Sequence, residues 1–267
     1  MTQNNENLSD DLNALSWQVD MGIDEVISEK PINRFEPAKK APAKKAVARQ
    51  PERPAIIKPD MVKPASPTIA EADAETLAAA ANSLEELEKV IQDFEGCSLK
   101  KTAMNTVFAR GDVSSKLMLI GEAPGGDEDR QGKPFVGASG KLLDKMMAAI
   151  GLEVDSGYYI SNILPWRPPG NRKPTPQEQT ICLPFIKRHI ELADPDLLVF
   201  LGGTAVSALL NISDGITRVR GRWYSYPVGK KTIPAMATFH PAYLLRQPQL
   251  KRQSWQDLLE IKAKLRG

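Results

Sequence analysis

The sequence predicts an α/β fold in which a parallel sheet is covered by helices on both faces. Short apolar runs alternate with helical patterns, and strands that alternate with helices in this way form parallel sheets. Of the 267 residues 42% are hydrophobic, which is enough to build a buried core. Ligands of such sheets bind beyond the carboxyl ends of the strands, so the functional residues are expected there.

The expected strands are apolar runs bounded by polar or turn-forming residues. They are Lys116–Ile120, Tyr158–Leu164, Asp196–Leu201 and Thr232–Phe239. The helical patterns between and after them are Ser139–Ile150, Pro176–Leu192, Gly203–Leu210 and Trp255–Leu265. Two Ser/Thr-x-x-Glu capping boxes mark helix starts: Ser83 with Glu86 near residue 80, and Thr175 with Glu178.

The first third of the chain has a different composition. Residues 31–67 contain eight prolines in a Lys-rich and Ala-rich context, a composition that predicts a disordered linker over 31–79. Before it, residues 1–30 carry a loose apolar stripe around Trp17 that predicts a short amphipathic helix, which could contact DNA or another protein. The folded domain is expected over residues 80–267.

The charge distribution indicates a partner. The net charge is only +2, but residues 94–267 hold 24 Lys and Arg against 16 Asp and Glu. Such an excess suits a polyanion, nucleic acid above all, because Lys and Arg that neutralise phosphates release counterions. A merely soluble basic surface explains the same excess equally well.

Several features address location and redox state. No run approaches the roughly 18 apolar residues that a membrane span requires, so no membrane association is expected. The opening residues MTQNNENLSDDL carry acids where an export signal carries a basic patch. A cytoplasmic location follows, and the only two cysteines, Cys97 and Cys182, are expected to remain thiols there.

Polar and aromatic candidates follow three of the expected strands. Glu122 and Phe135 lie in GEAPGGDEDRQGKPFVGASGKLL, which fits neither the phosphate-binding P-loop nor the GxGxxG dinucleotide pattern. Asn162 ends the second strand, where an amide could read a nucleobase edge. Taken singly, each of these three is better explained as a loop or core residue. His240 follows the fourth strand, and for it a functional role is favoured, whereas mid-helix His189 is expected on the surface.

Two further stretches fit contact with DNA. Arg218, Arg220 and Arg222 recur with period two, which would align them on one face of an extended segment, where they could hold phosphates or form salt bridges. In HPAYLLRQP, apolar Leu244 and its neighbour Leu245 precede Arg246, a composition that suits a wedge entering a base stack. Buried residues at the start of a helix would look the same.

Three motifs in this order resemble the family 4 uracil-DNA glycosylases: GEAPGGDEDRQGKPFVGASGKLL, NILPWRPPGNRKPTP and TFHPAYLL. The resemblance covers residues 94 to about 260. It implies a three-layer α/β/α sandwich with a four-stranded parallel sheet. It also implies hydrolysis of the N-glycosidic bond between uracil and deoxyribose in DNA. No lysine is implicated as a Schiff-base nucleophile, so we expect a monofunctional enzyme, and we expect it to be a monomer.

The resemblance also implies roles for individual residues. Glu122 and Ala123 would lie at the pocket, with Glu122 positioning or activating water. Gly125 falls where related glycosylases use a tyrosine to exclude the methyl group of thymine. Phe135 would stack on the base, Asn162 would bond its polar edge, and His240 would donate to O2 of the leaving base. Leu244, with Leu245 less certainly, would fill the gap that the extruded nucleotide leaves.

One departure from the family concerns its cofactor. The family holds a four-iron, four-sulfur cluster on four cysteines, and the matching positions here are Phe94, Cys97, Trp166 and Cys182. A cubane cluster needs four ligands. We therefore expect no cofactor and no metal, with aromatic packing in the vacated volume; a labile metal site on the two sulfurs is the alternative.

The function expected is therefore excision of uracil in base excision repair. The alternative, from another class, is a catalytically weakened DNA-binding module that recruits repair or replication partners. Glu122, Asn162 and His240 together favour the enzyme, because a pure binding module has no chemical need for them.

Overall fold

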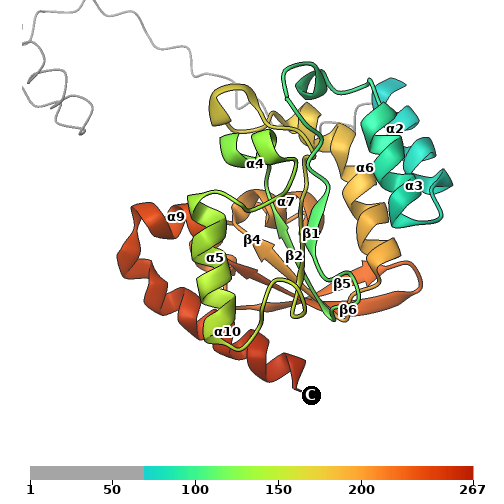
Figure 1. Ribbon diagram of the computed structural model, residues 1–267. Coiled ribbons are helices and arrows are strands. Elements are labelled where there is room, and N and C mark those ends of the chain that lie inside the picture. The colour runs from blue at the N-terminus through green and yellow to red at the C-terminus, as the bar shows by residue number, and fades with distance from the viewer. Residues whose placement is uncertain (1–68, 267) are drawn as a thin grey trace, which may run out of the picture. The chain divides into compact units, whose positions relative to one another are not determined.

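The computed structural model describes residues 69–266, in which a six-stranded sheet lies between two layers of helices (Figure 1). The strands are β1 (Ala109–Gly111), β2 (Leu117–Gly121), β3 (Tyr159–Asn162), β4 (Leu197–Leu201), β5 (Trp223–Val228) and β6 (Lys231–Thr238). The α-helices are α2 (Ile69–Ala80), α3 (Leu84–Asp93), α4 (Gly126–Gln131), α5 (Ala138–Ala149), α6 (Pro176–Ala193), α7 (Gly203–Leu210), α8 (Ile216–Val219), α9 (Pro241–Arg246) and α10 (Lys251–Leu265). Short 3₁₀ turns are η1 (Ser98–Lys101), η2 (Pro169–Asn171) and η3 (Pro248–Leu250).

The sheet is mixed, in the order β1-β3-β2-β4-β6-β5. Parallel pairing joins β3, β2, β4 and β6, whereas β1 and β5 pair antiparallel at the two edges. The expected sheet of four parallel strands is therefore corrected to six strands. The edge strands escaped the sequence analysis because β1 has only three residues and β5 directly follows an arginine-rich stretch.

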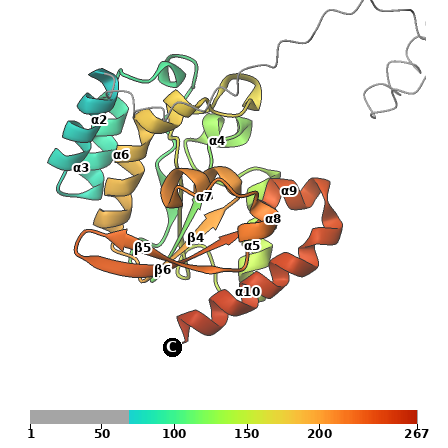
Figure 2. The ribbon, with the colours of Figure 1, turned by 180° about the vertical axis from the view of Figure 1, so that it is seen from behind.

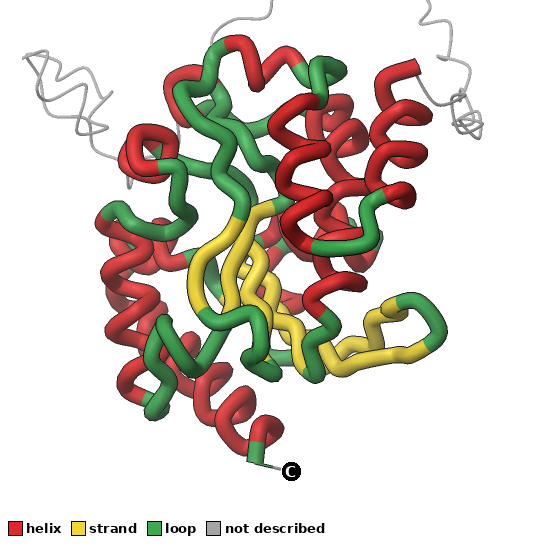
Figure 3. Tube along the Cα trace, turned by 45° about the vertical axis from the view of Figure 1, so that its right-hand side comes forward, coloured by secondary structure: helices red, strands yellow, loops and turns green. Residues whose placement is uncertain are grey.

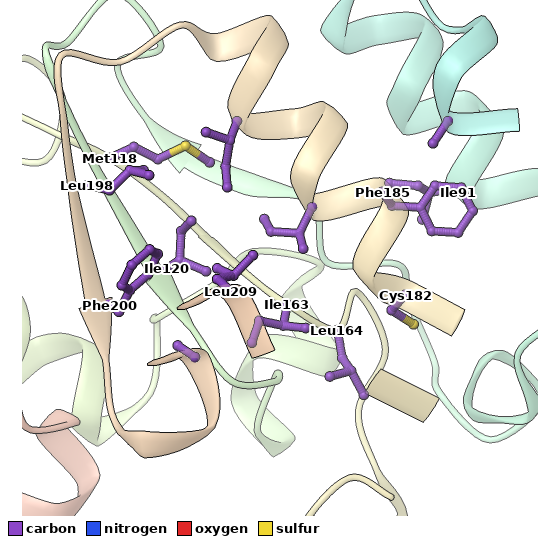
Figure 4. Packing of buried hydrophobic residues seen from close by; sticks show 14 of the residues in the cluster. Ile91, Met118, Ile120, Ile163, Leu164, Cys182, Phe185, Leu198, Phe200 and Leu209 are labelled. Carbon is purple, nitrogen blue, oxygen red and sulfur yellow. The ribbon is translucent and has the colours of Figure 1, made fainter. Parts of the chain in front are cut away.

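The alternation of side chains along the inner strands builds both halves of the core. On one face of the sheet, side chains from β2, β4 and β6 belong to a core cluster with residues of α2, α3, α6 and α7. These strand residues are Met118, Ile120, Leu198 and Phe200, which Figure 4 shows, together with Ala235 and Ala237. The residues between them face α5 and α10 on the other side; they are Leu117, Leu119, Leu197, Val199, Leu201 and Met236. Figure 2 shows the same two helical layers from behind. Burial on both faces explains why these strands are continuous apolar runs.

The folded part begins earlier than expected. Helix α2 starts at Ile69, within the stretch 31–79 that the composition assigned to a linker, and it packs against α6. Its buried residues are Ala74 and Ala78. Small side chains let two helices approach closely but give little amphipathic signal, so the pattern of large apolar residues missed this helix. The predictions for residues 1–30 and for the linker up to residue 68 lie outside the described residues.

The arginine-rich segment is not extended. Residues Ile216–Val219 form α8, and the chain then turns through Arg220 and Gly221 into β5. Strands β5 and β6 form a long hairpin that closes at Gly229, which has a positive φ of 55° (Figure 3). The period-two spacing of Arg218, Arg220 and Arg222 therefore does not align their side chains on one face.

Both predicted capping boxes begin a helix. The Ser83 side chain accepts from the backbone N–H of Glu86 at the start of α3, and Thr175 does the same for Glu178 at α6. Over residues 69–266, none of the helices combines the length and the apolar character that crossing a bilayer demands.

His189 is buried in α6 and not on the surface as expected. Its ring stacks on Phe108, with 4.2 Å between ring centroids, and its Nε2 lies 2.9 Å from the hydroxyl of Tyr159. Burial lowers the pKa of His189 to about 3. The folded protein therefore holds this ring neutral and hydrogen-bonded.

The buried His189 should make the protein sensitive to acid. Below the ordinary pKa of 6.5 the unfolded chain binds a proton at this ring, while the folded chain does not until about 3. The free energy of unfolding should therefore fall as the pH is lowered through this window. His189→Gln removes the ionisable group, so the fall measured by urea unfolding between pH 7 and about 4.5 should be shallower. Equal falls in both proteins would contradict this expectation.

Candidate functional site

The carboxyl ends of β3, β2 and β6, strands of the parallel part of the sheet, place polar side chains at one edge of the sheet. Glu122 directly follows β2, Asn162 ends β3, and His240 follows β6 after one intervening residue. Gly121 and Asn162 are paired in the parallel register of β2 and β3. Backbone bonds from Ile163 to Gly121 and from Leu164 to Glu122 continue this pairing beyond the strands.

These side chains share one cavity of about 490 Å³. Its lining includes most of the residues that the sequence selected, namely Glu122, Ala123, Gly125, Phe135, Asn162, His240 and Arg246. Arg218, Arg220, Arg222 and Leu244 are not in this lining. The cavity volume lies within the usual range of about 300–1,000 Å³ for ligand sites.

The loop after β2 brings Phe135 into the cavity wall. Phe135 has a left-handed backbone with a φ of 55°, which is costly for a bulky residue. Two glycines make its position possible. A Cβ at Gly121 would lie 2.6 Å from the Phe135 ring, and one at Gly140 would lie 1.8 Å from the Phe135 carbonyl oxygen. The ring centroid lies 5.6 Å from that of His240, with 33° between the ring planes.

Asn162 has a buried acceptor without a partner. The side chain is 5% exposed, and its Oδ1 makes no hydrogen bond to any residue in the range 69–266. A buried polar atom left unpaired costs about 1–3 kcal/mol. Asn162 also belongs to the lining of the cavity, so a ligand bound there is a candidate source of the missing donor.

His240 is a neutral hydrogen-bond donor. It caps α9, and its Nδ1 accepts from the backbone N–H of Ala242 at 3.1 Å. Burial lowers the pKa of His240 to about 4, and the positive charge of Arg246 adds to this effect. Because Nδ1 accepts in a neutral ring, the proton resides on Nε2.

Glu122 is held by a residue that the sequence analysis did not select. Thr204, at the start of α7, donates its hydroxyl to Oε2 of Glu122 at 2.5 Å. The carboxylate is partly exposed and lines the cavity. Thr204 therefore bonds one carboxylate oxygen of Glu122. This contact does not involve the other oxygen, Oε1.

A second missed residue, Glu128 of α4, organises the glycine-rich loop. Its carboxylate accepts from the backbone N–H of Gly125 at 3.1 Å and from that of Gly137 at 2.8 Å. A Cβ at Gly125 would lie 2.7 Å from Oε2 of Glu128. A side chain at position 125 would therefore require the Glu128 carboxylate to shift from its bonds to the loop.

The structure separates the two leucines of the predicted wedge by their burial. Leu244 is fully buried on the inner side of α9, whereas Leu245 is 46% exposed. A helix turns successive side chains by about 100°, so adjacent leucines cannot both face the core. Leu245 is therefore the side chain of this pair that a partner can reach.

Basic side chains surround the opening of the cavity. Arg172, Lys173 and Arg246 are exposed and belong to its lining. Arg172 also forms two hydrogen bonds with Glu178, at 2.9 and 2.6 Å. Sequence analysis selected only Arg246, although the NRKP run before α6 carries a visible local excess of positive charge.

The four positions that match the cluster cysteines lie in one apolar region. Phe94 and Trp166 stack with 6.5 Å between ring centroids, and Phe94 also meets the edge of Phe185. Cys97 and Cys182 are fully buried and unoxidised. A hydrogen bond with Cys182 lowers the pKa of Cys97 to about 7, while the same contact and burial raise that of Cys182.

These residues do not fit a four-cysteine cluster. Two positions offer sulfur, and the other two offer aromatic rings, one of which donates its indole N–H to Thr106. Across residues 69–266, His, Cys, Asp and Glu side chains do not gather in any group of three or more that could hold a metal ion.

Comparisons with known proteins agree on one family. Residues 108–259 match the family model described as the uracil DNA glycosylase superfamily. The chain is 39% identical over 183 residues to a type-4 uracil-DNA glycosylase of Archaeoglobus fulgidus, covering 67% of this chain and 92% of that protein. It is 38% identical over 186 residues to the type-4 enzyme of Thermotoga maritima, covering 67% of this chain and 95% of that protein.

Proposed function

The chain belongs to the uracil-DNA glycosylase superfamily, and from the geometry of its cavity we propose that it removes uracil from DNA by hydrolysing the N-glycosidic bond. The observation that carries this proposal is the unpaired Oδ1 of Asn162 in a cavity that also contains Glu122, Phe135 and His240. A pyrimidine brings the missing donor. The substrate is a uracil nucleotide that has been rotated out of the strand.

The base is recognised by hydrogen bonding and stacking. Asn162 accepts from N3–H of uracil through Oδ1 and donates to O4 through Nδ2. Cytosine has no hydrogen on N3 and a donor at position 4, so it opposes both bonds. Phe135 stacks on the ring.

Bond cleavage creates two charges that the site can stabilise. As the N-glycosidic bond lengthens, the sugar gains positive charge and the base gains negative charge. His240 donates Nε2–H to O2 of the leaving base. Glu122 stabilises the sugar cation and positions the attacking water, and Thr204 keeps its carboxylate oriented. Preorganised groups of this kind need no reorganisation during the reaction.

The proposed reaction is tested with a uracil-containing oligonucleotide and the purified full-length protein. Alkali treatment should reveal a strand break at the uracil position, and no break should occur without alkali. Release of no uracil at any salt concentration would favour the alternative, a DNA-binding module without catalytic activity.

We assign the wedge role to Leu245 and phosphate contacts to Arg172, Lys173 and Arg246. Leu245→Ala should lower uracil excision from duplex DNA by about tenfold and leave excision from single-stranded DNA little changed, because a single strand has no stack to fill. Leu244→Ala, at the buried neighbour, should instead lower the free energy of unfolding by about 2–5 kcal/mol. If Leu244→Ala selectively slowed excision from duplex DNA while Leu245→Ala destabilised the fold, Leu244 would be the wedge.

We also propose that Phe94 and Trp166 replace the iron–sulfur cluster as the packing core of this region. The purified protein should hold less than about 0.1 iron per chain and show no visible charge-transfer band, because two thiols cannot complete the four ligands of a cubane. Excision should be unaffected by an iron chelator. Stoichiometric iron in protein purified without oxygen would contradict this expectation.

The cytoplasmic location, the monomeric state and a role for the N-terminal segment stay predictions.

A further inference from the structure

Arg220, which the sequence grouped with two other arginines as a phosphate contact, lies in an ion pair inside the protein. Its Nε donates to Oδ2 of Asp257 at 3.0 Å, and its Nη2 bonds the other oxygen, Oδ1. The side chains are only 15% and 2% exposed. Nη2 also donates to the backbone carbonyl of Gln253 at 2.6 Å. Two of the three guanidinium nitrogens are thus engaged within the protein.

The ion pair contacts both ends of one segment of the chain. On one side, Thr238 at the end of β6 donates its hydroxyl to Asp257 at 2.7 Å, and the Arg220 guanidinium lies 5.5 Å from the centroid of the Phe239 ring. On the other side, Gln253 and Asp257 belong to the first half of α10. The segment between these contacts contains His240, all of α9 and η3.

The backbone next to Arg220 also contacts β6 and Asp257, through Gly221. Gly221 donates its backbone N–H to the carbonyl of Ala237 in β6 at 2.8 Å. Gly221 has a positive φ of 68°, and a Cβ there would lie 2.7 Å from Oδ1 of Asp257. Phe239, which contacts the guanidinium, also packs against Tyr243 of α9. Arg220 is therefore linked to α9 through a continuous series of contacts.

We propose that the Arg220–Asp257 pair is a brace that fixes both ends of the segment 238–257, and so holds α9 where the exposed Leu245 can enter the base stack. This inference rests on the proposed function, since it assigns Leu245 to the base stack. Arg220 is a positioning residue in this scheme and not a phosphate contact. Arg218 serves as the matched control, because its side chain is 79% exposed and its ion pair, at 3.6 Å, is with Asp214 and not with α10.

Loss of the brace predicts a pattern of excision rates that a general loss of stability does not. Opening a duplex requires the exposed end of α9 to enter the stack at a fixed place, whereas a base in a single strand is already accessible. Loosening the segment should therefore reduce excision from duplex DNA more than excision from single-stranded DNA. A phosphate contact has another signature, since its loss lowers the salt dependence of DNA binding.

The test compares Arg220→Gln with Arg218→Gln in the full-length chain. Single-turnover excision is measured on single-stranded and duplex oligonucleotides, and binding to uracil-free duplex is measured at several salt concentrations. For Arg220→Gln we expect a loss of about tenfold or more on duplex, less than about threefold on single strands, and an unchanged salt slope. Arg218→Gln should keep the wild-type ratio of the duplex rate to the single-strand rate.

Other results would overturn the brace. Equal losses on the two substrates would show a general structural role, and a salt slope lowered by about one unit would show a phosphate contact. If Arg220→Gln does not fold, Thr238→Val tests the same contact by removing one hydroxyl. This variant should lower the excision rate on duplex DNA more than the rate on single strands. Equal losses on the two substrates would reject the proposal. Wild-type protein that excises uracil from neither substrate would instead contradict the proposed function.

Discussion

Asn162→Ala is expected to lower the single-turnover rate of uracil excision, measured with enzyme below saturation, by about 10²–10³-fold, the effect of removing a pair of hydrogen bonds from a buried recognition site. Asn162 is the end of β3, so its amide is fixed by the sheet and not by a loop. Its Oδ1 has no partner within the described chain, and in the proposed complex the N3–H of uracil is that partner. The loss should therefore appear in recognition of the base.

The stability of the Asn162→Ala variant should not fall with its activity. In the free protein the unpaired oxygen is a cost, so removing it should leave the midpoint of thermal unfolding unchanged or raise it. Activity and stability are measured on one preparation, by single-turnover excision and by thermal unfolding. A large loss of stability together with the loss of activity would show that Asn162 is bonded in the free protein and would remove the main support for the proposed role.

The comparison between Leu244 and Leu245 shows what a sequence pattern cannot predict. Both leucines follow Pro241 in an apolar run, and the run alone does not say which one faces the core. Contacts of α9 with α5 decide it, and these residues are far apart in the sequence. The inner strands were predictable because burial on both faces leaves a continuous apolar run, which requires no knowledge of neighbours.

The arginines illustrate the same limit for polar residues. Arg218 and Arg220 are equivalent in the sequence, yet one is exposed and the other pairs with Asp257 in α10. Glu128 and Thr204 were missed for a related reason: their partners are backbone N–H groups and another side chain across the fold. In contrast, the strand ends place Glu122, Asn162 and His240, because the topology of a parallel sheet brings the ends of its strands together.

Replacing His240 is expected to have the second large effect. His240→Asn keeps a side chain that can cap α9 by accepting from the backbone N–H of Ala242, since asparagine is a good N-cap residue. It removes the Nε2 donor. Loss of one preorganised donor to a developing anion costs about 10²–10³-fold in rate, so we expect a loss of that size with little change in the free energy of unfolding.

The leaving base offers a sharper criterion for the role of His240. A base whose anion is more stable, such as 5-fluorouracil, depends less on a donor at O2. The loss caused by His240→Asn should therefore be smaller for 5-fluorouracil than for uracil in the same DNA sequence. Asn162→Ala should show no such difference, because Asn162 contacts the polar edge in the bound base as well as in the transition state. Equal losses for the two bases would mean that His240 only binds the substrate, and the charge on the leaving base would then have to be stabilised by another group.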